Sequence, residues 1–448
     1  MTEQKQELIP TALITPIHQG YSITEAVTEA KRCLQCKNPS CKKGCPISHD
    51  IPQWIHAISV GNIGDAARLI YEKSNLPAMC GRVCPHEKQC EGNCILNKKE
   101  APIRVGKLER FVAEFAQQAL LDIPTPPSEK KGRVAVVGAG PAGLTAAEEL
   151  ALRGYEVVLY EEQELLGGIL TYGIPEFRLP KKSVMHELER IHALNIDFRP
   201  LQKMGRDFTI DSLRSEGYDA IFLGIGATAT KRMNFPGDDL EGVVQSAHFL
   251  HQANLLAMGK ISLEEVPVKA GQHVIVIGGG NVAMDGARTA LRMGAKVTVM
   301  YRRTNVEMPA LKSEYEQAVQ EGVTFHWRTQ VRAAQGENGK LKSCTAVSEA
   351  GEAQVDVDVI LVAIGSEADK EAVQSTRVST NEWGYIQTKE MPYGITNYED
   401  VFAAGDIVHS PETVVLAMRE AKKVAQDIDR YITAKKLITA ASAPIAND

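Results

Sequence analysis

The chain of 448 residues contains one pattern twice, and this internal repeat limits its possible folds more than any other feature. The segments RVAVVGAGPAGLTAAEELALRGYEVVLYEE (133–162) and HVIVIGGGNVAMDGARTALRMGAKVTVMYRR (273–303) align without a gap at an offset of 140. Each segment predicts a short apolar strand, a glycine turn, a helix and a second apolar strand, which together form a βαβ unit. Two such units predict two doubly wound α/β domains with parallel sheets.

The glycine turns of the repeat indicate nucleotide binding. The first glycine suits the tight turn, the second lets the backbone approach a pyrophosphate, and a third small residue lets the helix pack against the strand. These positions are Gly138, Gly140 and Gly143 in the first copy and Gly278, Gly280 and Ala283 in the second. The adjoining residues of the predicted sites are Pro141, Ala142, Gly279, Asn281 and Val282.

The end of the second strand distinguishes the two nucleotides. In the first copy this position is Glu161, whose carboxylate can accept hydrogen bonds from ribose hydroxyls, as FAD requires. In the second copy it is Tyr301, followed by Arg302 and Arg303. Two guanidinium groups can hold a 2′-phosphate through charge-assisted hydrogen bonds, so the second copy is expected to bind NADPH in preference to NADH.

A late segment, VFAAGDIVHSPETVVLAMREAKKVAQDI, predicts a strand, Gly405-Asp406, a loop and a helix. We expect it to return to the first nucleotide site, with Asp406 bonding the ribityl or pyrophosphate part of FAD. The strand ends IFLGIGAT and ILVAIGS, the latter with Gly365, are predicted where the chain crosses between the domains.

This organisation predicts three domains, one of them discontinuous. A helical domain is expected over 1–128, an FAD domain over 129–235 and 369–448, and an inserted NADPH domain over 236–368. The segment LDIPTPPSEKKG reads as a linker, and the tail TAKKLITAASAPIAND is expected to be frayed.

Eight of the nine cysteines lie in two groups of four within the helical domain. The first group is Cys33, Cys36, Cys41 and Cys45, and the second is Cys80, Cys84, Cys90 and Cys94. The first spacing, with a proline after its last cysteine, resembles the iron–sulfur run of bacterial ferredoxins. Zinc sites would prefer two Cys-x2-Cys pairs, and disulfides are rare in a reducing compartment, so both remain weaker alternatives to two 4Fe–4S clusters.

Composition excludes several other classes of protein. The net charge of −6 provides no field that would hold nucleic acid or an anionic membrane. The first residues, MTEQKQELIP, lack the apolar stretch of a signal peptide, and no apolar run could span a bilayer, so a cytoplasmic protein is expected. Outside the cysteine groups only Cys344 remains, which leaves no cysteine pair for a disulfide reductase.

The order of these parts resembles the small (beta) subunit of bacterial glutamate synthase. It is equally similar to the large subunit of NADH-dependent reduced ferredoxin:NADP⁺ oxidoreductase and to the amino-terminal half of dihydropyrimidine dehydrogenase. The resemblance extends from about Glu25 to Ile428 and includes LPAMCGRVCPHEKQCEGNC, APIRVGKLERF, LLGGILTYGIPEFRLP and MYRRTNVEMPA.

The resemblance implies a set of ligands for each cofactor. One cluster would be held by Cys33, Cys36, Cys41 and Cys94, and the other by Cys45, Cys84, Cys90 and Glu109. Counting cysteines alone would instead make Cys80 the eighth ligand, and this alternative stays open. The resemblance also implies FAD contacts at Gly168, Ile169, Arg178, Thr413 and Val414.

These features predict an NADPH-linked FAD and iron–sulfur oxidoreductase that serves a partner subunit. The favoured hypothesis is the NADP⁺-reducing large subunit of a ferredoxin- and NADH-linked transhydrogenase, working with a smaller flavin or iron–sulfur subunit and able to bifurcate electrons. The alternatives are the NADPH-oxidising small subunit of glutamate synthase, a dihydropyrimidine dehydrogenase subunit, and a relay subunit without turnover. No catalytic side chain is expected, because hydride transfer needs mainly the placing of one ring against another.

Overall fold

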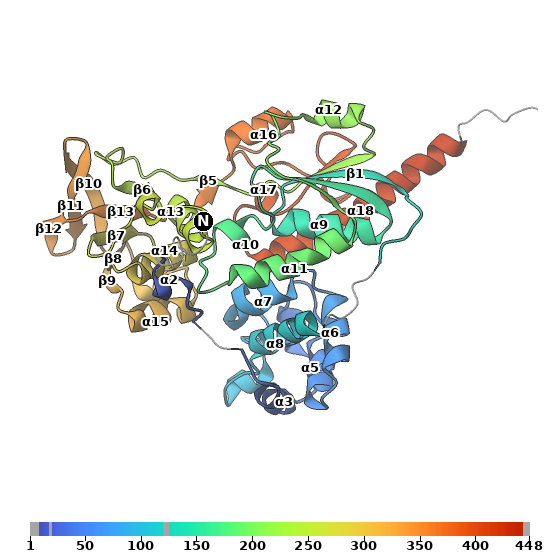
Figure 1. Ribbon diagram of the computed structural model, residues 1–448, viewed down its shortest axis with the longest axis horizontal. Coiled ribbons are helices and arrows are strands. Elements are labelled where there is room, and N and C mark those ends of the chain that lie inside the picture. The colour runs from blue at the N-terminus through green and yellow to red at the C-terminus, as the bar shows by residue number, and fades with distance from the viewer. Residues whose placement is uncertain (1–8, 18–19, 120–124, 442–448) are drawn as a thin grey trace, which may run out of the picture. The chain divides into compact units, whose positions relative to one another are not determined.

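The structure is a computed structural model that describes residues 9–17, 20–119 and 125–441. The chain forms two compact units, each described here by itself (Figure 1). The first unit comprises Met1–His18, Thr171–Lys181 and Ala229–Ser366, and the second comprises Gln19–Leu170, Lys182–Thr228 and Glu367–Asp448. The second unit therefore contains most of the predicted helical domain and most of the predicted FAD domain.

The amino-terminal part of the second unit is helical, as predicted (blue in Figure 1). Its elements are α3 (Ile23–Lys31), α4 (Ser40–Gly44), α5 (Ile51–Ser59), α6 (Ile63–Tyr71), α7 (Pro77–Val83), η1 (His86–Lys88), η2 (Ile95–Lys98) and α8 (Val105–Gln118). The start of α3 is a capping box in which the Glu25 backbone N–H donates to Ser22 Oγ and the Ser22 backbone N–H donates to the Glu25 carboxylate. Apolar side chains of α5, α6 and α8, among them the fully buried Trp54, form the core of this part.

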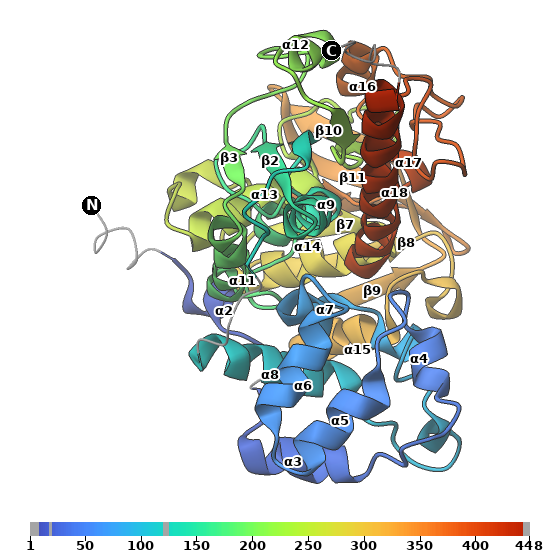
Figure 2. The same ribbon diagram turned by 90° about the vertical axis from the view of Figure 1, so that its right-hand side faces the viewer.

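The rest of the second unit is built on a parallel sheet in the order β15-β4-β1-β2-β3. Its strands are β1 (Gly132–Val137), β2 (Tyr155–Tyr160), β3 (Asp197–Arg199), β4 (Ala220–Leu223) and β15 (Val401–Ala403). Its helices are α9 (Pro141–Leu152), α10 (Ile169–Tyr172), α11 (Lys181–Ala193), α12 (Ile210–Ser215), α16 (Lys370–Thr376), α17 (Asp406–His409) and α18 (Val414–Ala441). The last two residues of α10 and the first of α11 belong to the first unit. Helices α9 and α18 pack side by side (Figure 2).

The first unit contains a second parallel sheet, in the order β6-β13-β7-β8-β9. Its strands are β6 (Val243–Gln245), β7 (His273–Ile277), β8 (Lys296–Tyr301), β9 (Thr324–Trp327) and β13 (Val359–Val362). Its helices are α2 (Thr11–Ile14), α13 (Ser246–Ala257), η3 (Leu263–Glu265), α14 (Asn281–Arg292), η4 (Asn305–Glu307) and α15 (Lys312–Glu321). The short strands β5 (Ala229–Thr230) and β14 (Ser366–Glu367) pair with each other near the two chain crossings.

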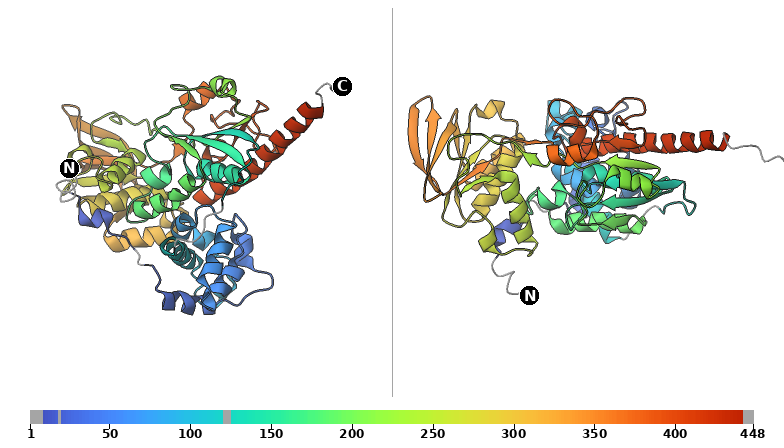
Figure 3. Two further views of the ribbon diagram at one scale, coloured as in Figure 1. Left: turned by 45° about the vertical axis from the view of Figure 1, so that its right-hand side comes forward. Right: turned by 90° about the horizontal axis from the view of Figure 1, so that it is seen from above.

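A separate antiparallel sheet of β10 (Gln330–Glu337), β11 (Lys340–Ser348) and β12 (Gly351–Asp356) completes the first unit (orange in Figure 3). Sequence analysis did not anticipate this sheet. Cys344 lies on β11 and is fully buried, with no disulfide partner among the described residues.

The predicted fold class is confirmed, since each copy of the repeat is a βαβ unit in a parallel sheet. The expected frayed tail is wrong for residues up to Ala441, because α18 continues as one helix of 28 residues. Within the described ranges, no helix combines the length and the apolar composition needed to cross a bilayer.

Candidate functional site

The first glycine turn, between β1 and α9, leaves an open space at one position. A Cβ on Gly143 would lie 1.7 Å from the Gly138 carbonyl oxygen, so this glycine is needed for close packing of helix against strand. A Cβ on Gly140 would meet no protein atom within 4 Å. This space lies at the start of α9, whose free backbone N–H groups favour an anion such as a pyrophosphate.

Glu161 connects the end of β2 to this turn. Its carboxylate accepts hydrogen bonds from the backbone N–H of Ala139 at 2.7 Å and of Gln163 at 2.9 Å. Burial raises the pKa of Glu161, and the two backbone N–H groups oppose that shift. A carboxylate has about four lone-pair positions, so Glu161 can still accept a ribose hydroxyl, as the FAD prediction requires.

Two further predicted FAD segments approach the same turn. A Cβ on Gly168 would lie 2.9 Å from Gly140 Cα, and a Cβ on Gly405 would lie 2.9 Å from Ala142 Cβ. Both glycines have positive φ, +52° and +81°, which favours glycine over other residues. The structure thus brings together segments that lie far apart in the sequence.

The side chains that follow Gly405 are suited to a polar ligand. Burial raises the pKa of Asp406 to about 6, and its carboxylate accepts the backbone N–H of Glu412 at 3.2 Å. Thr413 Oγ1 is buried and has no hydrogen-bond partner among the described residues. A buried hydroxyl without a hydrogen bond lowers the stability of the folded protein, so Thr413 favours a bound ligand that forms one. Val414, the next residue, begins α18. These residues therefore fit the predicted flavin.

Arg178 lies in the first unit instead, close to α14 and α15. Its guanidinium forms ion pairs with Asp285 at 2.6 Å and Glu314 at 3.2 Å, and is almost completely buried. Ile169, at the start of α10, is 54% exposed. The roles of Arg178 and Ile169 as FAD contacts remain predictions.

The second glycine turn repeats the first in its main features. A Cβ on Gly278 would lie 2.2 Å from the Ala363 carbonyl oxygen, whereas a Cβ on Gly280 would meet nothing within 4 Å. Asn281, the first residue of α14, accepts the backbone N–H of Leu311 through Oδ1 at 2.9 Å. Val282 is partly exposed beside it, and Gly365 follows β13 with a φ of +113°.

The position equivalent to Glu161 is occupied by an aromatic ring. A Cβ on Gly279 would lie 2.6 Å from the Tyr301 ring, so this glycine makes room for the ring, a constraint that sequence analysis missed. Arg302 and Arg303 follow at the end of β8 with exposed side chains, and neither forms a salt bridge with a described residue. Both guanidinium groups are therefore available to a phosphate.

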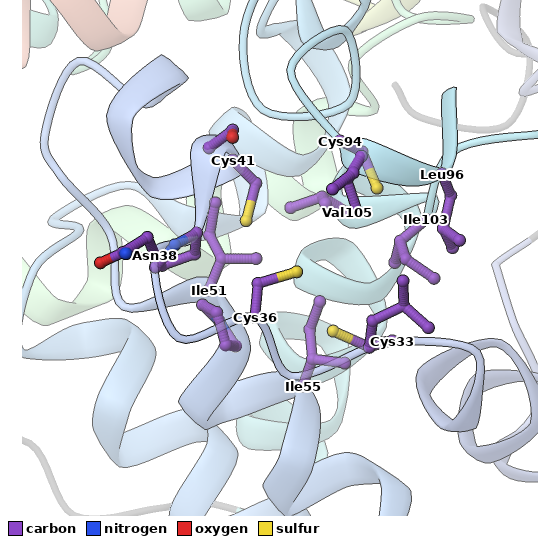
Figure 4. Close-up of a pocket in the computed structure, with 15 residues that line it drawn as sticks. Cys33, Cys36, Asn38, Cys41, Ile51, Ile55, Cys94, Leu96, Ile103 and Val105 are labelled. Atoms are coloured by element: carbon purple, nitrogen blue, oxygen red, sulfur yellow. The ribbon is translucent and has the colours of Figure 1, made fainter. Parts of the chain in front are cut away.

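Four of the predicted cluster ligands line one cavity of about 70 Å³. Figure 4 shows the thiols of Cys33, Cys36, Cys41 and Cys94 pointing into this space, with apolar side chains between them. One water needs roughly 10–15 Å³, so the cavity suits a larger group. Among the described residues, no three His, Cys, Asp or Glu side chains are placed to hold a single metal ion.

The other predicted ligands form a second group, in which Cys90 and Glu109 are buried and Cys45 and Cys84 are partly exposed. Burial raises the pKa of Cys45 to about 11, and the charges of Glu109 and Cys80 add to the shift. The pKa of Cys84 is raised first by a hydrogen bond with Cys80. Burial also raises the pKa of Cys90 and of Glu109. The raised pKa values mean that burial disfavours the charged forms of these groups. Coordination to iron would offset this free-energy cost, because it favours the thiolate form of a cysteine.

Cys80 and Glu109 both belong to this second group, so the structure does not choose between them as ligand. Cys80 Sγ lies 3.7 Å from Met418 Sδ on α18 and 3.9 Å from Ser74 Oγ. Glu109 Oε1 lies 3.9 Å from Nδ1 of the buried His49, a neighbour that sequence analysis missed. No motif in the sequence marked His49, since it lies outside both cysteine groups.

Comparison with known proteins identifies related families. The model of the pyridine nucleotide-disulphide oxidoreductases matches residues 132–421, and that of the 4Fe-4S domain II of dihydropyrimidine dehydrogenase matches residues 11–120. The putative oxidoreductase UacF of Escherichia coli is 36% identical over 92% of this chain and 68% of its own. The glutamate synthase (NADPH) small chain of Azospirillum brasilense is 34% identical, with 96% of this chain and 93% of the relative covered.

A third relative is the dihydropyrimidine dehydrogenase subunit PreT of Escherichia coli, 35% identical over 91% of this chain and 94% of its own. Among solved structures, FprA of Mycobacterium tuberculosis in complex with NADPH has a TM-score of 0.57 at 16% identity, covering 71% of this chain and 87% of FprA. Thioredoxin reductase of Lactococcus lactis has a TM-score of 0.53 at 21% identity, covering 68% of this chain and 99% of the reductase. These two structures share the fold.

Proposed function

The chain belongs to the pyridine nucleotide-disulphide oxidoreductase family and carries an amino-terminal 4Fe–4S domain, and from this we propose that it passes electrons between NADP(H), FAD and two clusters for a partner subunit. The observation that carries the proposal is the cavity lined by Cys33, Cys36, Cys41 and Cys94. It lies in the same compact unit as the first glycine turn.

The residues of the two nucleotide sites would bind FAD and NADP(H) and orient their reactive rings. When bound, FAD exchanges a hydride with the nicotinamide and releases electrons singly, and each cluster accepts one electron. The start of α9 and Glu161 would hold the FAD pyrophosphate and ribose, and Asp406 and Thr413 would bond nearer to the flavin. The start of α14, with Arg302 and Arg303, would hold NADP(H) by its 2′-phosphate.

The family is named after disulphide chemistry, but this chain has only Cys344 outside the two cysteine groups. Because a disulphide reductase needs a cysteine pair, electrons are expected to leave through the helical domain instead. The amino-terminal cysteines would then do the work that a redox-active pair does in disulphide reductases.

The partner defines the finer function, for which three candidates stand. Sequence analysis favours the NADP⁺-reducing subunit of a ferredoxin- and NADH-linked transhydrogenase. The glutamate synthase small chains support the second candidate, because their similarity covers more than nine-tenths of both chains. In that case a large subunit would receive the electrons. The third candidate, a subunit that serves a pyrimidine-reducing partner, is supported in the same way by the similarity to PreT.

The general proposal is tested on protein purified without oxygen. We expect FAD, iron and acid-labile sulfide in the preparation, and reduction of ferricyanide by NADPH. Protein that holds FAD but no iron or sulfide after reconstitution would contradict the proposal. Purification of the native complex, with identification of the accompanying subunit, distinguishes the three candidates.

A further inference from the structure

Cys80 is a buried cysteine that the ligand set implied by the resemblance leaves unused. It is 2% exposed and lies on α7, four positions before Cys84, a predicted ligand of the second cluster. Side chains four positions apart on a helix lie on the same face, and those of Cys80 and Cys84 are hydrogen-bonded to each other. Cys80 can therefore act on the cluster without binding iron, by donating a hydrogen bond to the ligand sulfur.

The partner of Cys84 differs in kind from the partners of the other predicted ligands. Four of these accept a hydrogen bond from a nearby backbone N–H: Cys33 from Gln35, Cys41 from Lys42, Cys45 from His49 and Cys90 from Glu91. Hydrogen bonds donated to ligand sulfurs help to set the reduction potential of an iron–sulfur cluster. At Cys84 the partner is the side chain of Cys80, so a thiol takes the role that a backbone N–H has elsewhere.

The surroundings of Cys80 favour this direction of its S–H group. The fully buried Ser74 donates from its hydroxyl to Cys80 Sγ at 3.9 Å, and Cys80 Sγ lies 3.7 Å from Met418 Sδ. The two neighbouring sulfurs, Met418 Sδ and Cys84 Sγ, compete for the one hydrogen of the thiol. A thioether is a weak acceptor, whereas a thiolate is charged and a stronger one. The competition therefore favours Cys84 whenever Cys84 is a thiolate.

We propose that Cys80 is a positioning residue of the second cluster, whose S–H donates a hydrogen bond to the Cys84 thiolate and makes the cluster easier to reduce. The inference rests on the proposed function and on Cys84 as a ligand. Reduction adds one electron, which the flavin supplies under the proposed function, and the ligand sulfurs carry part of the added negative charge. The positive end of the S–H dipole stabilises that charge, and Cys80 keeps its proton throughout. Ser74 strengthens the bond, because a hydroxyl that donates to a thiol polarises its S–H group.

The test is a redox titration of the holoenzyme followed by electron paramagnetic resonance, which gives the midpoint potential of each cluster. Cys80→Ala removes the donor, Cys80→Ser replaces the thiol with a hydroxyl that still donates, and Ser74→Ala removes only the donor to Cys80. Cys344→Ala, which removes a buried thiol from β11, is the matched control. Cys90→Ala identifies the signal of the second cluster, because Cys90 is a ligand whether Glu109 or Cys80 is the eighth. Iron and FAD contents are measured for every protein.

We expect Cys80→Ala to keep both clusters and to lower the equilibrium constant for reduction of the second cluster about tenfold, which is about 59 mV for a one-electron couple. Ser74→Ala should shift the same potential in the same direction by a smaller amount. Cys80→Ser and Cys344→Ala should remain close to wild type. The potential of the first cluster should be the same in all four variants and wild type.

Several outcomes would overturn the proposal. Loss of about four iron atoms from Cys80→Ala would make Cys80 a ligand. An unchanged second potential in Cys80→Ala, or an equal fall in Cys80→Ser, would show that the donated hydrogen bond has no effect. If Cys80→Ala failed to fold, as judged by loss of FAD, an unchanged potential in Ser74→Ala would overturn the proposal. Wild type without iron and acid-labile sulfide after reconstitution would instead overturn the proposed function.

A further variant separates hydrogen bonding from packing. Met418→Leu preserves the side-chain volume and removes the competing sulfur acceptor. We expect the potential of the second cluster to be no lower than in wild type, because Cys84 is then the remaining sulfur acceptor for the thiol. A fall as large as that in Cys80→Ala would attribute the effect to the packing of α18 against α7 and would overturn the proposal.

Discussion

At the scale of single residues, the two copies of the repeat use one position in different ways. Glu161 places a carboxylate against the first glycine turn, where it bonds Ala139 N–H at 2.7 Å. Tyr301 places a ring against the second turn, close to Gly279. The tyrosine adds no negative charge beside Arg302 and Arg303, and this difference supports a phosphate at the second site and a ribose hydroxyl at the first.

Replacing both Arg302 and Arg303 with alanine should weaken the binding of NADPH but not that of NADH. Each charge-assisted hydrogen bond contributes about 1.5–3 kcal/mol, so we expect KM for NADPH to rise about 10- to 100-fold. Steady-state ferricyanide reduction with NADPH and with NADH measures the effect. An unchanged ratio of the two KM values would contradict the assignment, and Arg328→Ala, at another exposed arginine, is the control.

The eighth cluster ligand can be identified by comparing Glu109→Ala with Cys80→Ala. We expect Glu109→Ala to lower the iron content from about eight to about four atoms per chain, because one cluster loses a ligand. Cys80→Ala should keep its iron. Cys344→Ala, which removes a buried thiol from β11, is the control. The opposite result for the first two variants would make Cys80 the ligand.

At the scale of elements, two glycines of the first turn have different functions. Gly143 lets the helix pack against the strand, whereas Gly140 leaves room for the predicted pyrophosphate. Gly143→Ala should destabilise the protein by more than about 2 kcal/mol, because its Cβ would overlap the Gly138 carbonyl. Gly140→Ala should change the stability of the FAD-free protein by only about 0.5 kcal/mol, yet raise the Kd for FAD at least about tenfold. Thermal unfolding and FAD titration measure both, and equal FAD affinity in Gly140→Ala and wild type would contradict the predicted pyrophosphate position.

The sequence predicted those elements that carry a local signal. The capping box at Ser22 and Glu25 and the glycine turns at Gly138 and Gly278 occur as expected, because each depends on residues close together in the chain. The antiparallel sheet β10–β12 was missed, since its polar and apolar residues alternate irregularly around two register shifts. The end of α18 was missed because TAKKLITAA, which favours helix, was grouped with the polar residues that follow it.

At the scale of the whole chain, the helical domain and the FAD domain belong to one compact unit. The backbone N–H of Ala78 on α7 donates to Glu187 on α11, and Arg82 donates to Ser183 Oγ. The Arg190 guanidinium lies 4.2 Å from the centre of the Tyr71 ring. None of these contacts could be predicted from sequence, because each joins residues about a hundred positions apart that carry no shared motif.

Glu187 should make this contact sensitive to pH. Burial raises the pKa of Glu187 from 4.5 to about 7, with Arg190 opposing the shift. Between these values the folded state holds a proton that the unfolded state has released, so stability falls as pH rises. We expect wild type to lose about 2 kcal/mol more than Glu187→Gln between pH 5 and pH 8, measured by unfolding at both pH values. Parallel pH profiles for the two proteins would contradict this role.

Part of the candidate site could be proposed from the sequence, because the predicted cluster ligands follow a spacing. The cysteines assigned to the first cluster line one cavity, although Cys94 is distant in sequence from Cys33. The surroundings of Arg178 could not be predicted from spacing, because its ion pairs with Asp285 and Glu314 depend on the packing of three separate segments. The same holds for His49 beside Glu109 in the helical domain.

The contact of 3.7 Å between Met418 and Cys80 has a genetic consequence. Met418 belongs to the helix that starts at Val414, whereas Cys80 belongs to the helical domain. A bulky replacement at 418 would press on the Cys80 thiol and through it on Cys84, a predicted cluster ligand to which Cys80 is hydrogen-bonded. A strain deficient in iron loading could therefore carry its lesion hundreds of codons downstream of every cysteine involved. Suppressors of such a lesion should then arise around Cys80.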